Sequence, residues 1–85
     1  MSQPSLTSIV AENLAYRREH SDGGIGISQA QLAARAGLSS GMVSQIEQGR
    51  RTPSLETIER LAGAMGFRDR AWVLLVPRKR KGRKS

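Results

Sequence analysis

Apolar residues recur at intervals of three and four along most of the chain, which is the spacing that places them on one face of an α-helix. The pattern runs from Leu6 to about His20, resumes after Ser28, and is clearest between Leu55 and Met65, where it forms an amphipathic stripe. The segment from Phe67 to Val76 is shorter, and its run AWVLLV fits a strand as well as a helix. We interpret it as a short fifth helix.

Serine and glycine residues mark where these helices begin and end. Ser28 and Gln31 form the reciprocal capping pair S-x-x-Q at the start of the second helix, and Gly37 suits the left-handed conformation that ends it. Ser39 is placed to cap a third helix, which spans residues 39–48. The end of the third helix and the two ends of the fourth carry the same signals, at Gly49, Ser54 and Gly66. The pattern predicts an all-α fold of five helices, with a flexible loop over residues 21–26.

The positive charge is concentrated at one end of the chain. Fourteen Lys and Arg residues stand against seven Asp and Glu residues, which gives a net charge of +7. Six of the fourteen lie in the last eight residues, RKRKGRKS, so residues 1–77 carry eight positive and seven negative side chains. We therefore expect a flexible arm of residues 1–5, one compact domain of residues 6–77 and a disordered basic tail of residues 78–85.

Composition excludes several classes of function. With no cysteine and one histidine, the chain has no disulfide framework and no material for a transition-metal site. No apolar run approaches the roughly 20 residues of a membrane span, and the N-terminus lacks the features of a signal peptide, so a cytoplasmic location without membrane contact is expected. Residues 37–41 spell G-x-S-x-G, but they join two helices rather than a strand and a helix. We expect no enzyme activity, no cofactor, no metal and no small-molecule ligand.

The most informative stretch is QAQLAARAGLSSGMVSQIEQ, residues 29–48, in which two short helices meet at Gly37. Leu38, Val43 and Ile46 form an inner apolar face, so the opposite face of the second of these helices is held outward. That geometry suits insertion of the helix into the DNA major groove.

This region resembles the phage-repressor-like (Xre-type) helix-turn-helix family of transcription regulators. The resemblance runs from about Asn13 to Phe67 and is closest in IEQGRRTPSLETIERLA. It implies a compact five-helix DNA-binding domain whose partner is double-stranded DNA. Another helical bundle with the same apolar core would explain the apolar spacing, but not the placement of the capping residues and glycines together.

The family's functional positions map onto individual residues of this chain. The resemblance implies base reading by Ser40, Gly41, Ser44 and Gln45, and phosphate binding by Gln29, Ser39, Arg50 and Arg51. It also implies a structural ion pair between Arg18 and Glu47. For each polar residue the alternative is an ordinary solvated side chain.

Three features depart from the family pattern. The loop between Arg18 and Gln29 is about four residues longer than usual, and Arg17 stands where leucine is common. Gly41 places no side chain at a base-reading position. Direct readout should therefore be modest, so that specificity depends on DNA shape, on dimer spacing or on a partner other than DNA.

The C-terminal region suggests further contacts. An apolar group in the fifth helix either caps the core or forms a symmetric dimer contact, and we favour the dimer; its members are Phe67, Trp72, Leu74 and Leu75. The tail either keeps the protein soluble or adds phosphate contacts through Arg78, Lys79, Arg80 and Lys81.

The sequence thus predicts a small sequence-specific regulator, acting as a homodimeric repressor or controller on a paired operator and controlled by its own abundance or by a regulatory protein partner. The alternative is a protein-binding antiactivator or antitoxin-like module that uses the same fold with little DNA binding.

Overall fold

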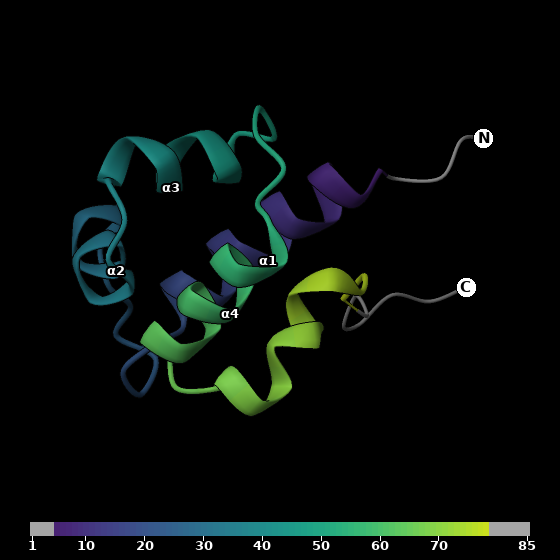
Figure 1. Cartoon of the computed structure of the whole chain (residues 1–85). Coiled ribbons are helices and arrows are strands. Elements are labelled where there is room, and N and C mark those ends of the chain that lie inside the picture. The colour runs from purple at the N-terminus through teal and green to yellow at the C-terminus, as the bar shows by residue number, and fades with distance from the viewer. Residues whose placement is uncertain (1–4, 79–85) are drawn as a thin grey trace.

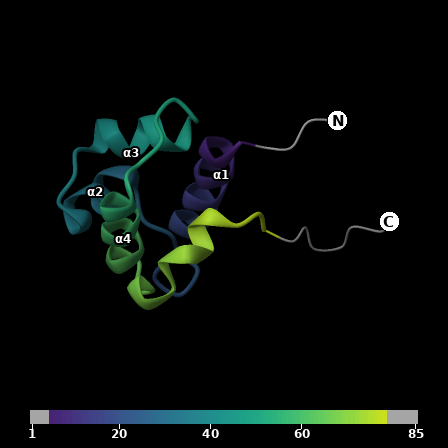
Figure 2. The same ribbon diagram turned by 45° about the vertical axis from the view of Figure 1, so that its right-hand side comes forward.

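The computed structural model describes residues 5–78, and within this range it is built from helices without strands. The elements follow in the order α1 (Leu6–Glu19), α2 (Gln29–Ala36), α3 (Ser40–Glu47), α4 (Leu55–Ala64) and the 3₁₀ helix η1 (Arg68–Leu75). Figures 1 and 2 show α2, α3 and α4 grouped on one side of α1, with η1 running back along the other end of the molecule. The expected all-α fold of five helices is confirmed.

Local capping chemistry sets the helix boundaries. Ser28 Oγ accepts a hydrogen bond from the backbone N–H of Gln31 at 3.0 Å, and Gln31 Oε1 accepts one from the backbone N–H of Ser28 at 2.8 Å. Ser39 and Ser54 cap α3 and α4, as predicted, through the hydroxyl alone, which accepts from the backbone N–H of Met42 and of Thr57 respectively. Ser5, which we placed in the flexible arm, instead caps α1, because its hydroxyl accepts from the N–H of Ser8. The other arm residues lie outside the described range.

The helix-turn-helix requires one backbone conformation that most residues avoid. Gly37 follows α2 with φ 73° and ψ 33°, in the left-handed region where a side chain is strained. Its N–H and that of Leu38 bond back to the last turn of α2. The chain therefore turns within three residues and starts α3.

The long loop between α1 and α2 is more ordered than its three glycines suggested. The backbone N–H of Ile27 donates to the carbonyl of Arg18 at 3.1 Å, and Ser21 Oγ donates to the carbonyl of Arg17 at 2.7 Å. A Cβ at Gly26 would lie 2.8 Å from the carbonyl oxygen of Glu19, so the loop passes close against the end of α1. The loop is thus folded onto the helix, which corrects our expectation of a flexible connection.

The core is formed by apolar side chains from all five elements. Its fully buried members include Leu14, Leu32, Val43, Ile46, Leu61 and Leu74. Because α1 and α2 pack against the inner face of α3, the core fixes α3 on the outside of the molecule.

The fifth element is the short helix that we predicted, but it is not an α-helix. Its backbone is 3₁₀, and it breaks at Arg70, which has φ −126° and ψ 36°. Asn13 on α1 is buried, and its Nδ2 donates to the carbonyls of Leu74 at 3.0 Å and Val76 at 2.7 Å. This side chain pins the end of η1 to α1.

The structure divides the four proposed dimer residues. Phe67 and Leu74 are buried in the core of the single chain. Trp72 is 59% exposed and Leu75 is half-buried. Of the four residues predicted to form a dimer contact, Trp72 and Leu75 are therefore the ones exposed to solvent, and the dimer itself stays a prediction.

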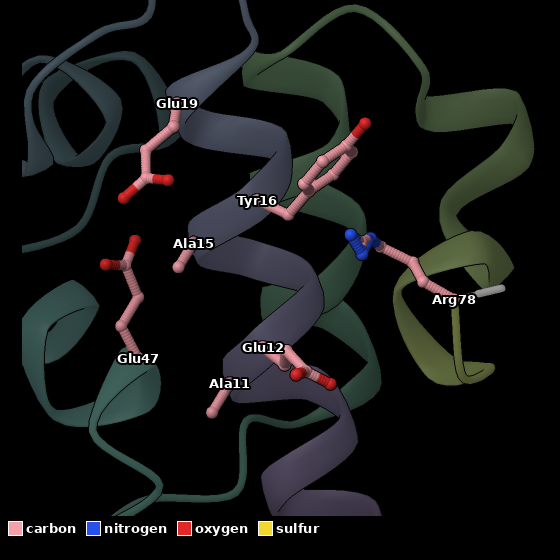
Figure 3. A pocket seen from close by; sticks show the side chains of 7 residues that line it. All are labelled: Ala11, Glu12, Ala15, Tyr16, Glu19, Glu47 and Arg78. Atoms are coloured by element: carbon pink, nitrogen blue, oxygen red, sulfur yellow. The ribbon is translucent and has the colours of Figure 1, made fainter. Parts of the chain in front are cut away.

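An open depression of about 570 Å³ lies along α1 (Figure 3). The carboxylates of Glu19 and Glu47 stand on one side of it, and on the other the guanidinium of Arg78 lies 3.6 Å from the centre of the Tyr16 ring.

Within residues 5–78, no group of three His, Cys, Asp or Glu side chains is arranged to hold a metal ion. No helix in the same range is long and apolar enough to cross a membrane.

Candidate nucleic-acid interface

The two faces of α3 have opposite character. Val43 and Ile46 are fully buried and point into the core. The outer face is polar and open to solvent; its residues are Ser40, Gly41, Ser44, Gln45 and Gln48, of which Ser44 alone is half-buried. We call these five residues the outer face of α3. The polar outer face of α3 can therefore enter a groove of a nucleic-acid duplex while the apolar face stays packed in the core.

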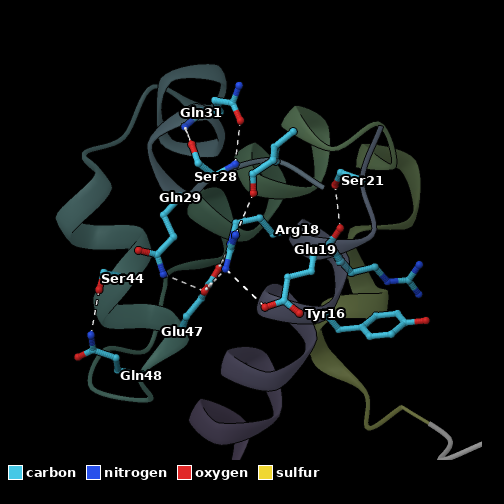
Figure 4. A network of polar contacts seen from close by, with 12 residues as sticks. Tyr16, Arg18, Glu19, Ser21, Ser28, Gln29, Gln31, Ser44, Glu47 and Gln48 are labelled. Atoms are coloured by element: carbon cyan, nitrogen blue, oxygen red, sulfur yellow. Dashed lines mark hydrogen bonds and ion pairs between the residues drawn. The ribbon is translucent and has the colours of Figure 1, made fainter. Parts of the chain in front are cut away.

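An ion pair fixes the C-terminal end of α3 against α1. Arg18 donates from Nε to Glu47 Oε2 at 2.6 Å and from Nη2 to Glu47 Oε1 at 3.0 Å, as Figure 4 shows. The two side chains are 14% and 7% exposed, so water screens the pair little. The hydrogen bond to Glu47 raises the pKa of Arg18, so the guanidinium stays charged. The structure thus contains the pair that the sequence predicted, and it joins two helices through residues 29 positions apart.

Gln29 joins the same network. Its Nε2 donates to Glu47 Oε1 at 2.9 Å (Figure 4), although we expected this side chain to bind phosphate. Glu47 therefore accepts hydrogen bonds from both α1 and the first residue of α2. One N–H of the Gln29 amide is used by Glu47, and the second N–H of the same nitrogen is left for a phosphate contact.

Two hydrogen bonds organise the outer face of α3. Gln48 Nε2 donates to Ser44 Oγ at 2.9 Å, one helical turn away (Figure 4). Arg51 Nη1 donates to Gln45 Oε1 at 3.2 Å from the segment that follows the helix. Gln48 was not among the site residues predicted from the sequence, although its spacing of four residues from Ser44 places both on one side of the helix.

The two arginines that follow α3 differ from three arginines that pair with carboxylates on other elements. Arg35, Arg60 and Arg68 each lie 3.0–3.5 Å from a carboxylate, those of Asp22, Glu56 and Glu59 respectively. Arg50 and Arg51 are exposed and form no ion pair within the described part of the chain. Two guanidinium groups without a neutralising carboxylate in that part therefore flank the C-terminal end of α3, and Ser39 flanks the other end as its cap.

The backbone conformation at position 41 does not require glycine. A Cβ built there would meet Ser39 Oγ at 4.0 Å as its nearest neighbour, which is ordinary contact distance, and φ is not positive. The missing side chain at this point of the outer face is therefore a property of the surface, not of the fold.

The remaining candidates are the tail residues. Arg78 lies over the Tyr16 ring beside α1, and Lys79, Arg80 and Lys81 lie outside the described residues.

Comparison with known proteins gives a consistent match. Residues 24–73 match the helix-turn-helix family. The chain is 34% identical over 61 residues to an uncharacterized HTH-type transcriptional regulator, y4dJ, of Sinorhizobium fredii, covering 72% of this chain and 74% of that protein. It is 46% identical over 41 residues to the immunity repressor protein of Bacillus phage phi105, but that match spans 48% of this chain and only 28% of the repressor.

A solved structure shares the whole architecture. The crystal structure of the hypothetical transcription factor NHTF from Neisseria superposes with a TM-score of 0.75 at 32% identity, covering 91% of this chain and 85% of that one.

Proposed function

The chain belongs to the phage-repressor-like (Xre-type) helix-turn-helix family, and on this basis we propose that it is a DNA-binding transcriptional regulator, not an enzyme, which acts as a dimer on a paired operator. In this proposal α3 enters the major groove of each half-site, and the two-fold axis of the dimer matches that of the operator. The DNA-binding unit is the domain of residues 6–77, whose helix-turn-helix spans residues 29–48.

The observation that carries the proposal is the two-sided character of α3. Its inner face is locked by Val43 and Ile46, and its end is tied to α1 and α2 through Glu47. A helix held at both its core face and its end keeps its outer face in one orientation, so little ordering remains when the groove is bound.

The outer face supplies hydrogen-bonding groups for base edges and phosphates. In our proposal Ser40, Ser44 and Gln45 reach base edges, while Gly41 allows a close approach of the backbone. Phosphate contacts come from four groups around the helix, namely Gln29, Ser39, Arg50 and Arg51. The guanidinium of Arg50, which is exposed and forms no ion pair within residues 5–78, supports this assignment most directly.

The dimer contact is proposed to centre on Trp72. Its ring is 59% exposed, and the neighbouring Val76 is 43% exposed, while Leu75 is half-buried beside them. An exposed tryptophan within an apolar surface is a frequent anchor of protein interfaces. Trp72→Ala should shift the protein from dimer to monomer in sedimentation velocity, and a wild type that sediments as a monomer at all concentrations contradicts this part.

DNA binding is tested by the retention of duplex DNA in a gel. The double variant Arg50→Ala/Arg51→Ala should weaken binding to duplexes of every sequence and lower the salt slope by about 0.9 for each phosphate that is no longer neutralised. Arg60→Ala is the matched control, because Arg60 is also exposed but lies on α4 and pairs with Glu56. Equal effects of the two changes would oppose the proposal.

The basic tail is proposed to add phosphate contacts of the same kind. Deleting residues 79–85 should reduce affinity for all duplexes and flatten the salt dependence further. An unchanged salt slope leaves the tail without a role in DNA binding.

A protein-binding module on the same fold is the second candidate. It is favoured by the near balance of charge outside the tail, where residues 1–77 carry eight positive and seven negative side chains. A stoichiometric protein partner in pull-down experiments, together with no protected DNA in footprinting, would select this candidate over the first.

A further inference from the structure

Two polar side chains on the outer face of α3, those of Gln45 and Ser44, each accept a hydrogen bond from a neighbouring side chain. Gln45 Oε1 accepts from Arg51 Nη1 at 3.2 Å, so one of the two lone pairs of that oxygen is used by a cation, while both N–H groups of Nε2 are left to bond outward. Ser44 Oγ accepts from Gln48 Nε2 at 2.9 Å, which leaves the hydroxyl proton of Ser44 to be donated. Both side chains therefore offer donors.

A surface of donors distinguishes the purines in the major groove. Guanine presents two acceptors there, N7 and O6, whereas adenine presents the acceptor N7 beside the donor N6 amino group. A free glutamine pairs with adenine because it offers one acceptor and one donor together. While Arg51 bonds to its oxygen, Gln45 keeps both donors but only one lone pair, and that lone pair lies beside a positive charge.

The charge of Arg51 acts in the same direction. Its guanidinium lies against Gln45 Oε1 and is exposed, with no carboxylate pairing it in the described residues. An adenine amino group approaching Oε1 would bring a partly positive hydrogen toward this cation, while guanine O6 would bring a partly negative oxygen. Arg51 and Gln45 together thus present N–H donors and a positive charge to the base.

We propose that Arg51 and Gln45 together read guanine, with Arg51 acting as the positioning residue that turns Gln45 from an adenine reader into a donor for guanine N7 and O6. This inference rests on the proposed DNA-binding function and specifies the base at one position of each half-site. It also changes the role of Arg51, which the sequence assigned to phosphate binding alone.

The test is a selection from a pool of randomised duplexes, followed by binding measurements on the enriched sequence. The position whose preference disappears in Gln45→Ala identifies the base read by this side chain. We expect guanine there, and replacement of that guanine by 7-deazaguanine, which lacks the N7 acceptor, should weaken binding by about tenfold.

Arg51→Ala and Arg50→Ala form the matched pair of variants. Both remove one exposed positive charge, but only Arg51 bonds to Gln45. Arg51→Ala should move the preference at the identified position from guanine toward adenine, and Arg50→Ala should lower affinity for all sequences while leaving the preference for guanine.

The outcomes separate this inference from the function on which it rests. A wild-type protein that selects adenine at the Gln45 position, or variants that change affinity without changing base preference, would overturn the inference while DNA binding stands. A protein that retains no duplex from the pool overturns the proposed function and this inference with it.

Discussion

Removing the carboxylate of Glu47 should destabilise the protein far more than removing a carboxylate from an exposed ion pair. Glu47 accepts three hydrogen bonds, two from Arg18 and one from Gln29, and its side chain is 7% exposed. In Glu47→Ala the guanidinium of Arg18 remains in a site where it is only 14% exposed and has no counter-charge from α3. The penalty comes mainly from this charge, whose remaining carboxylate partner is the exposed Glu19 at 3.8 Å.

The size of the effect follows from the geometry. Breaking a buried pair by removing one partner costs about 3–5 kcal/mol. Arg18 keeps its hydrogen bond from Nη1 to the carbonyl of Ile27 at 2.8 Å and its ion pair with the exposed Glu19 at 3.8 Å, so the lower end of that range applies. A decrease of about 3 kcal/mol corresponds to a fall of roughly 12–24 °C in the melting temperature of a domain of this size. Most small domains have a total stability of only about 5–15 kcal/mol, so the variant should lose a large share of its stability.

The assay is urea unfolding followed by circular dichroism, with two comparison variants. Asp22→Ala breaks the Arg35–Asp22 pair, whose side chains are 40% and 46% exposed, and should change the midpoint only slightly because water screens that pair. The double variant Arg18→Met/Glu47→Leu removes both charges together and should be more stable than Glu47→Ala. Equal midpoints for Glu47→Ala and Asp22→Ala would refute the reasoning.

Three further changes have outcomes that the structure fixes. Gly41→Ala should stabilise the protein by about 1 kcal/mol in urea unfolding, because the site has room for a Cβ and a helical backbone; destabilisation would show that the glycine is needed. Asn13→Ala should destabilise by about 1–3 kcal/mol, since three carbonyls of the C-terminal segment lose their donor, and unchanged thermal unfolding would contradict the anchoring role. The hydrogen bond from Arg35 lowers the pKa of Asp22, so its contribution to stability is present above the ordinary pKa of an aspartate and is lost as pH falls through the lowered value. Arg35→Ala should raise that pKa toward its ordinary value in a carboxyl NMR titration, and an unshifted curve would exclude the contact in solution.

The sequence predicted the helix boundaries because their chemistry is local. A cap such as Ser28 and its partner Gln31 lie within one turn, so the residues that form the bond are visible in a short window. Gly37 is readable for the same reason, since the positive φ belongs to that residue alone. Ser5 was missed because a proline just before it suggested an irregular arm.

The C-terminal segment could not be sorted into core and surface from its pattern. A regular helix would place Phe67, Trp72 and Leu75 by a fixed rotation, but the 3₁₀ backbone and the break at Arg70 change that rotation twice. Tertiary contacts from Asn13 on α1, 60 or more residues away, fix where the segment lies. The spacing of apolar residues along the chain does not predict such a contact.

The hydrogen-bonded side-chain pairs of the interface could be predicted from the sequence only in part. The pair of Arg18 with Glu47 was predicted from the family resemblance, while the bond from Gln29 to Glu47 depends on how α2 and α3 pack. The bond from Arg51 to Gln45 depends on the path of the chain after α3. The family resemblance implied that these residues are functional, but only the fold shows which of their donors and acceptors already form hydrogen bonds.

The most direct test of the central claim is NMR mapping of the ¹⁵N-labelled protein with a duplex enriched by selection. If α3 enters the major groove, the largest shifts should fall on the backbone of residues 40–48 and on the side-chain amides of Gln45 and Gln48, with little change around Trp72. Shifts confined to η1 or to the exposed side of α1, with the α3 signals unmoved, would contradict the claim.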